Sequence, residues 1–132
     1  MVKIPKEVSE LLGQKETVKI LVTADSKGQP HGIVCGSIGI IGEDTLSVGE
    51  IFMKRSSKNM NENKKVAILA ANGPKAYEVQ ATVLGREDSG ANLDGLNKAL
   101  SAANLKANAV WKFKAEAVYD EGAGPNCGKK IA

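Results

Sequence analysis

The sequence predicts a mainly β fold, a closed antiparallel barrel of six strands capped by about three short helices, in one domain spanning residues 1–132. Six short runs alternate apolar and polar residues with the period of half-buried strands. Short turns join most of these runs. A flat sheet of six short strands would leave two unpaired edges, and closing the sheet into a barrel removes these edges. The chain also has the length of a single domain. An open α+β sandwich is the alternative architecture.

The first half of the chain predicts two helices and three strands. Pro5 and Gly13 suit the start and the end of the first helix. A turn at 25–28 joins the first two strands into a hairpin. Gly36 and Gly39 interrupt the second strand, and glycine within a strand marks a bulge or a close approach to the backbone. The predicted elements are a helix at 5–13, strands at 17–24, 30–41 and 45–48, and a helix at 53–63.

The second half predicts three strands and one helix. An apolar strand at 65–71 is followed by the turn dipeptide Asn72-Gly73 and a longer strand at 75–85. Leucines with helical spacing predict a helix at 93–103, and alternation predicts a last strand at 109–119. The tail at 122–132 is rich in glycine, so we expect no regular element there.

Composition argues against several classes of function. Aromatic residues make up only 4% of the chain and the net charge is +3, so we expect no nucleic-acid partner. Cys35, Cys127 and His31 are the only cysteine and histidine residues, too few for a four-ligand zinc site, and no metal site is predicted. The sequence has no long apolar run and no signal peptide, which predicts a cytoplasmic protein with no membrane contact and with free thiols. Acidic pairs in turns read as solvated, so no catalytic residue is assigned.

The excess positive charge lies in one segment, where the second helix is predicted to begin. Ser56 or Ser57 can cap that helix, with Lys54 and Arg55 just upstream. A helix N-terminus carries partial positive charge, and arginine can grip a phosphate with two hydrogen bonds. The segment therefore predicts a phosphate site. The alternative is a capped surface helix with solvated lysines, and His31 reads as an exposed or half-buried polar residue.

The order of these elements, the run KRSSKNMNENKKVAIL after a strand ending in SVG, and the closing VYDEGAGPNCGKKIA resemble the FMN-binding split-barrel family, the pyridoxamine 5′-phosphate oxidase-like proteins. The likeness is greatest to its short single-domain flavoproteins. It implies that Arg55 and Ser56, with Ser57 adjacent, hold the phosphate of FMN. It also implies that the flavin ring lies along two strands, against Val34, Cys35, Gly36 and Ser37 on one side and Val48 and Gly49 on the other.

The resemblance further implies a homodimer with the flavin in the cleft between subunits. The partner's last strand and tail, around Trp111 and Cys127, would then cover the ring. Trp111, Phe113 and Tyr119 share one face of the last predicted strand, and we expect some of them to face the partner. The arginine- and tryptophan-containing segment of true pyridoxamine phosphate oxidases has no counterpart in the sequence, so that activity is not expected.

The sequence thus predicts a small FMN-binding oxidoreductase or electron carrier whose small-molecule or electron-transfer partner is unknown. A flavin carries its own redox chemistry, so the lack of a catalytic dyad is no objection. One alternative is a split-barrel module for a deazaflavin or haem. The other is a nucleic-acid-binding barrel that uses the basic residues Lys54, Arg55, Lys58, Lys64 and Lys65.

Overall fold

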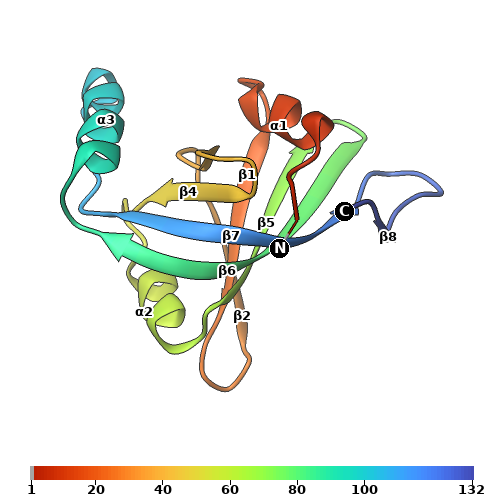
Figure 1. The fold of residues 1–132 in the computed structure, drawn as a ribbon, viewed down its shortest axis with the longest axis horizontal. Helices are drawn as coiled ribbons and strands as arrows, with labels where there is room; N and C mark the ends of the chain where they lie inside the picture. Colours follow the sequence, from red (N-terminus) through yellow and green to blue (C-terminus); the bar gives the residue numbers. More distant parts are fainter. Residues whose placement is uncertain (1) are drawn as a thin grey trace.

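The computed structural model describes residues 2–132 as one curled antiparallel sheet with three α-helices around it (Figure 1). The described elements are, in order, α1 (Lys6–Gly13), β1 (Val18–Ala24), β2 (Pro30–Val34), β3 (Gly39–Ile40), β4 (Thr45–Gly49), α2 (Lys54–Glu62), β5 (Lys65–Asn72), β6 (Lys75–Glu87), α3 (Ala91–Leu100), a 3-10 turn (Ser101–Ala103), β7 (Val110–Asp120) and β8 (Lys129–Lys130). Within residues 2–132, no helix combines the length and the apolar character needed to cross a membrane.

The strand order shows where the barrel is open. Neighbouring strands pair in the order β2-β1-β5-β6-β7-β4-β3, and β8 adds to β7. The two ends of this path, β2 and β3, are consecutive in the chain and are joined by residues 35–38. The Lys19 ammonium reaches across this opening to the carbonyl oxygens of Gly36 and Ile38, at 3.5 and 3.3 Å. The predicted mainly β barrel is confirmed, as a half-barrel split between β2 and β3.

The predicted strand at 30–41 is wrong as a single element, because it is two strands. The Cys35 amide still donates to the Lys19 carbonyl of β1, and the chain then leaves β1 and pairs with β4 from Gly39. The tail at 122–132 was also wrongly expected to lack regular structure. Its strand β8 pairs with β7 at Tyr119 and Asp120. The described sheet therefore has eight strands where the sequence predicted six.

The concave side of the sheet forms the main core. Alternation along each strand directs one side chain of every two inward, and α1 closes one end with Val8, Leu11 and Leu12. Register shifts between β6 and β7 bend the sheet at Gln80/Ala81 and Val83/Gly85. The largest fully buried side chains of the sheet include Leu21, Leu46, Ile68, Val79, Trp111 and Phe113.

Burial differs among the three aromatic residues of β7, some of which are expected to face a partner. Trp111 is 1% exposed and Phe113 is fully buried, so neither presents a surface to a partner. Both lie on the inward face of β7, where large side chains fill the half-barrel. Only Tyr119, of the three aromatic residues predicted to share a face, is partly exposed.

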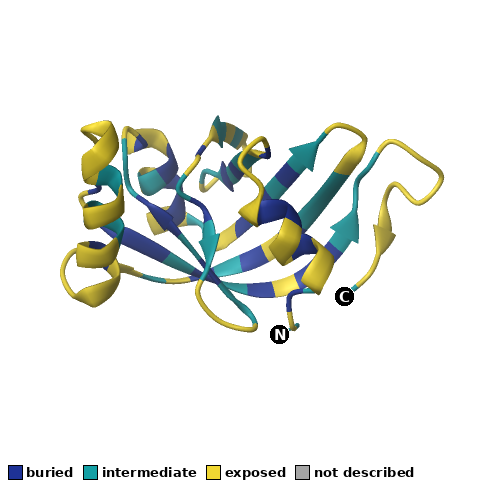
Figure 2. Ribbon diagram, turned by 90° about the horizontal axis from the view of Figure 1, so that it is seen from above, coloured by how far each residue is buried: buried dark blue, intermediate teal, exposed yellow. Residues whose placement is uncertain are grey.

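Two helices flank the opening of the barrel. Helix α2 lies against β1 and β2, and Asn59 of α2 donates to the Thr23 hydroxyl of β1 at 3.0 Å. Helix α3 stands at one end of the sheet and is largely exposed (Figure 2). Leu93 of α3 packs with Ala107 and Val110 in a small apolar cluster separate from the main core.

Candidate functional site

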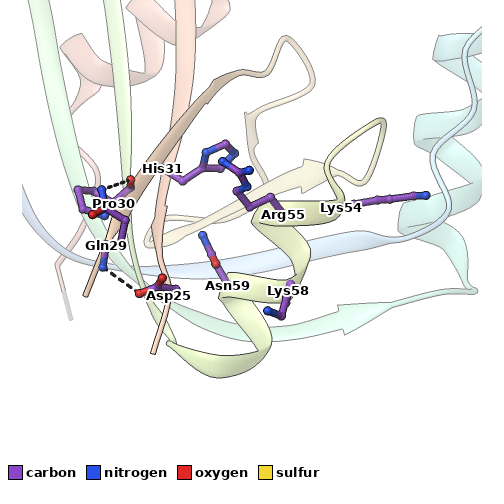
Figure 3. Close-up of a pocket in the computed structure, with 8 residues that line it drawn as sticks. All are labelled: Asp25, Gln29, Pro30, His31, Lys54, Arg55, Lys58 and Asn59. Atoms are coloured by element: carbon purple, nitrogen blue, oxygen red, sulfur yellow. Dashed lines mark hydrogen bonds between the residues drawn. The ribbon is translucent and has the colours of Figure 1, made fainter. Parts of the chain in front are cut away.

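A basic cavity of about 540 Å³ lies between β2 and the first turns of α2 (Figure 3). Arg55 of α2 and His31 of β2 both extend into it. Three of its side chains are cationic and only one, Asp25, is acidic. The residues that line it are Asp25, Gln29, Pro30, His31, Lys54, Arg55, Lys58 and Asn59. Its charge suits an anionic group.

His31 is the residue of this cavity whose position the sequence left undecided. It pairs in register with Thr23, which is buried on the concave side of the sheet. Directly opposed residues of an antiparallel pair share a face, so His31 faces the same side, toward α2. The register of the first hairpin was the signal that could have placed it there.

The start of α2 differs from the predicted cap. Met53 occupies the cap position, and no side chain of the described chain bonds to the free N–H groups there. Ser56 and Ser57 lie in the first helical turn, so the prediction that either serine caps the helix is wrong. Lys54 and Arg55 are likewise part of the helix. The uncapped N–H groups of this turn remain available to an anion.

The two serines point to different surroundings. Ser56 is fully buried on the core side of α2, and its Oγ has no hydrogen-bond partner among the described residues. It does not line the basic cavity. The Ser57 hydroxyl donates to Glu50 Oε1 at 2.9 Å. Of the three residues predicted to hold a phosphate, only Arg55 therefore reaches the basic cavity.

An apolar cavity of about 470 Å³ lies beside the opening of the barrel. It contains the segment predicted to contact a flavin ring, from Val34 to Ser37. Burial raises the pKa of the Cys35 thiol, so this group is uncharged near neutral pH. Every side chain that lines the cavity in the described chain is uncharged: Ile33, Val34, Cys35, Ser37, Ile51, Phe52, Leu96, Leu100 and Leu105, with Gly36 contributing backbone.

Ser37 links this segment to β4. Its hydroxyl accepts from the Gly49 amide at 3.0 Å. Gly49 itself is covered, since an added Cβ would come within 2.5 Å of Leu96 Cδ2 and 3.3 Å of Ser37 Oγ. Val48 is fully buried in the core. The segment from Val34 to Ser37 therefore lines the apolar cavity, whereas Val48 and Gly49 do not line it.

Glu50 is the centre of a hydrogen-bonded cluster that the sequence did not predict. Its Oε1 accepts from Ser57 Oγ, from Trp111 Nε1 at 2.9 Å and from Arg86 Nε at 3.0 Å, while its Oε2 accepts from Arg86 Nη2 at 2.9 Å. The hydrogen bonds from Arg86, followed by those from Trp111 and Ser57, outweigh desolvation and lower the pKa of Glu50 to about 2. The cluster ties the end of β4 to α2, β6 and β7.

Trp111 therefore has a different place from the one predicted. Its indole lies beneath Glu50, within the subunit, and lines none of the cavities described here. Cys127 is exposed on the tail, and its thiol lies 3.8 Å from Glu121. Within the described residues, Cys127 does not line the apolar cavity.

The five basic residues of the 54–65 segment do not form one continuous surface. Lys54, Arg55 and Lys58 line the basic cavity. The Lys64 ammonium instead donates to the Met60 carbonyl at the end of α2, and Lys65 lies on β5. This distribution favours a compact anionic group over an extended nucleic-acid backbone.

The comparisons with known proteins identify the fold. No model of a protein family matches the sequence. An uncharacterised protein from Methanocaldococcus jannaschii is 26% identical over 137 residues, covering 100% of this chain and 90% of that protein. HupZ from Group A Streptococcus has a TM-score of 0.79 at 21% identity, with 95% of this chain and 99% of that chain covered. An FMN-binding protein from Syntrophomonas wolfei has a TM-score of 0.77 at 17% identity, covering 85% and 82%.

Further solved structures with this fold differ in the ligand that their names specify. An F420 reductase has a TM-score of 0.67 at 19% identity, over 87% of this chain and 98% of that chain. HutZ, a haem storage protein from Vibrio cholerae, has a TM-score of 0.65 at 13% identity, over 92% and 97%. The fold of the chain is the split barrel of the pyridoxamine 5′-phosphate oxidase-like proteins, which confirms the fold that the resemblance implied. The names of three of these solved structures thus specify FMN, F420 and haem, one each.

Proposed function

We propose that the chain is an FMN-binding flavoprotein that acts as a small oxidoreductase or electron carrier. The observation that carries this proposal is the pair of cavities along β2, one basic and one uncharged and apolar. FMN has the same two parts, a phosphate and a planar uncharged ring. His31 of the basic cavity and Ile33 of the apolar cavity lie two residues apart on the same face of β2, a separation of about 7 Å along an extended strand. One ligand with an anionic end and an apolar end fits this arrangement.

The basic cavity would hold the phosphate. The Arg55 guanidinium offers paired donors, and Lys58 adds a second positive charge from the same helix. The uncapped N-terminus of α2 adds its partial positive charge. His31 and the Asn59 side chain complete the polar lining. This donor set fits a phosphate dianion and would leave an uncharged end group unmatched.

The apolar cavity would hold the ring. The segment from Val34 to Ser37 combines exposed backbone at Gly36 with uncharged side chains. An added Cβ at Gly36 would meet nothing within 4 Å, so the backbone is open to a ligand there. Bound FMN would supply hydride and electron transfer at its ring. The chain's own residues then have three tasks: to bind the phosphate, to orient the ring and to exclude water from one of its faces.

The proposal is tested by the visible spectrum of the purified protein and by titration of the ligand-free protein with FMN. We expect a yellow protein with two flavin absorbance bands, which releases free FMN on denaturation. A haem spectrum, or a deazaflavin spectrum without FMN binding, would assign another ligand to the cavities. A colourless protein that fails to bind added FMN would contradict the proposal.

A homodimer is the second part of the proposal, and the convex side of the sheet supplies its surface. Val34 is 75% exposed and Val18 is 48% exposed, both among the most exposed large apolar residues. Ile20 pairs with Val34 and with Leu69, so all three lie on the side opposite to buried Leu21. An apolar sheet face of this kind is typical of subunit contacts. It also lies next to the apolar cavity, because Val34 belongs to both.

We expect Val22→Lys to convert a dimer into a monomer. Val22 lies in the middle of this face, between Gly32 of β2 and Ala67 of β5, and a lysine there would place a charge in an apolar contact. Sedimentation equilibrium at micromolar concentration measures the change. Ile41→Lys is the matched control, because Ile41 is 47% exposed in the connection between β3 and β4, outside this face. A wild-type monomer with FMN bound would contradict the dimer.

A further inference from the structure

Lys19 of β1 is a basic residue on the inner side of the sheet. It pairs in register with Ala70 of β5, which is buried, and it lies two residues before Leu21, which is fully buried. Opposed residues of an antiparallel pair share a face, as do alternate residues of one strand, so the Lys19 side chain starts on the concave side. It is half-buried at the opening between β2 and β3. An ammonium group in this position needs polar partners.

The partners of Lys19 are backbone groups of the segment that joins β2 to β3. Its ammonium donates to the carbonyl oxygens of Gly36 at 3.5 Å and Ile38 at 3.3 Å. Its own carbonyl accepts from the Cys35 amide at 2.8 Å. Among residues 2–132, the ion pairs all involve other basic residues, so no carboxylate there pairs with Lys19. The ammonium is therefore bonded to neutral oxygens, and its positive charge is not compensated by a described ion-pair partner.

The segment bonded to Lys19 also forms part of the wall of the apolar cavity. Cys35, Gly36 and Ser37 line that cavity, whereas Lys19 does not. The charge still acts on this wall: burial raises the pKa of the Cys35 thiol, and hydrogen bonds from Ser37 and the charge of Lys19 oppose that rise. Every described side chain that lines the cavity is uncharged. The field of Lys19 therefore meets no opposing charge in the cavity wall.

We propose that Lys19 is a positioning residue of the flavin site, which holds the segment from Cys35 to Ile38 and makes the bound flavin easier to reduce. This inference rests on the proposed function, in which residues 34–37 face the ring. Two electrons and one proton convert the neutral oxidised ring into an anionic reduced ring. A positive charge bonded to the segment stabilises the anionic form more than the neutral form and therefore raises the reduction potential. Lys19 supplies charge and no proton.

The test is the midpoint potential of the FMN-loaded protein, measured by spectrophotometric titration with dithionite beside a reference dye. Lys19→Met removes the charge and keeps an unbranched side chain. We expect this variant to bind reduced FMN roughly three- to tenfold less tightly relative to oxidised FMN, which is measured as a more negative potential. Lys19→Arg keeps the charge and should keep the wild-type potential. Lys75→Met removes a lysine from the exposed start of β6 and should leave the potential unchanged.

Hydrogen exchange of the ligand-free protein, followed by NMR, tests the hold on the segment. The amides of Gly36, Ser37 and Ile38 should exchange faster in Lys19→Met than in wild type, because two hydrogen bonds that restrain the segment are lost. Lys19→Arg should restore nearly the wild-type exchange rates. Lys19→Gln supplies the uncharged comparison if Lys19→Met does not fold or does not hold FMN.

Three results would overturn the proposal. They are an unchanged potential in the uncharged variant, equal exchange of the segment in wild type and variant, and an equally large shift of potential in Lys75→Met. Failure of the wild type to hold FMN refutes the proposed function instead. The exchange rates of the ligand-free chain then still decide whether Lys19 positions the segment.

Discussion

Replacing Arg55 with alanine should raise the dissociation constant for FMN about ten- to a hundredfold. Arg55 is the cavity residue that offers a planar pair of donors, and hydrogen bonds to charged groups contribute roughly 1.5–3 kcal/mol each. Its side chain is exposed, so the fold should be unaffected. Titration of the ligand-free protein, followed by flavin fluorescence, gives the constant.

Riboflavin is the control for this prediction because it has the same ring and no phosphate. Its affinity should be nearly equal in wild type and Arg55→Ala. Lys75→Ala removes the same charge at an exposed site at the start of β6 and should leave both affinities unchanged. Equal losses for FMN and riboflavin would show that Arg55 supports the ring site or the fold, and no loss for either ligand would show that the phosphate binds elsewhere.

Glu50→Ala should lower the free energy of unfolding by about 2–3 kcal/mol at neutral pH, because it leaves a buried indole N–H without an acceptor and removes a charge-assisted pair. The Glu50 side chain is only 14% exposed, whereas Arg86 is 38% exposed and can turn to solvent. The loss therefore comes mainly from Trp111 and from the lost tie to Ser57. Urea unfolding measures the change.

The pH dependence of this loss is set by the Glu50 pKa. A carboxyl group whose pKa falls from 4.5 to about 2 on folding stabilises the protein above its unfolded value and loses that contribution as pH falls toward 2. The gap between wild type and Glu50→Ala should therefore be largest near neutral pH and shrink below about pH 4.5. Glu43→Ala removes a carboxylate from an exposed pair with Lys3 and should leave stability unchanged. A gap that stays constant down to pH 2 would contradict the role of the ionised carboxylate.

Local patterns predicted most elements of the fold. Alternation placed the first hairpin and the strands now seen as β5, β6 and β7, and the leucines of α1 gave its buried face. The break after Val34 was not predicted, because Gly36 and Gly39 lie in an otherwise apolar run to Ile41 and were interpreted as a bulge or a close approach within one strand. The chain changes partner there, from β1 to β4, and partner exchange is a property of the tertiary structure.

The basic segment pointed to Arg55, and the resemblance pointed to the segment from Val34 to Ser37. Both line cavities, and their contacts with a ligand stay predictions. The position of His31 depends on the register of the first hairpin. Trp111 lies on the inward face of β7 and is buried, so it is not at the surface. No sequence pattern indicates the hydrogen-bonded cluster around Glu50, because its partners Ser57, Arg86 and Trp111 are far apart in the sequence.

Trp111, which donates a hydrogen bond to Glu50, is an intrinsic fluorescence probe of the chain. Trp111 is the only tryptophan, so all indole emission comes from one buried ring that faces an ionised carboxylate. A flavin absorbs in the range where tryptophan emits, and a bound flavin therefore quenches this emission by energy transfer. Unfolding exposes the indole to water and shifts the emission to longer wavelength. One unlabelled fluorescence trace thus distinguishes a protein that has lost its ligand from one that has lost its fold.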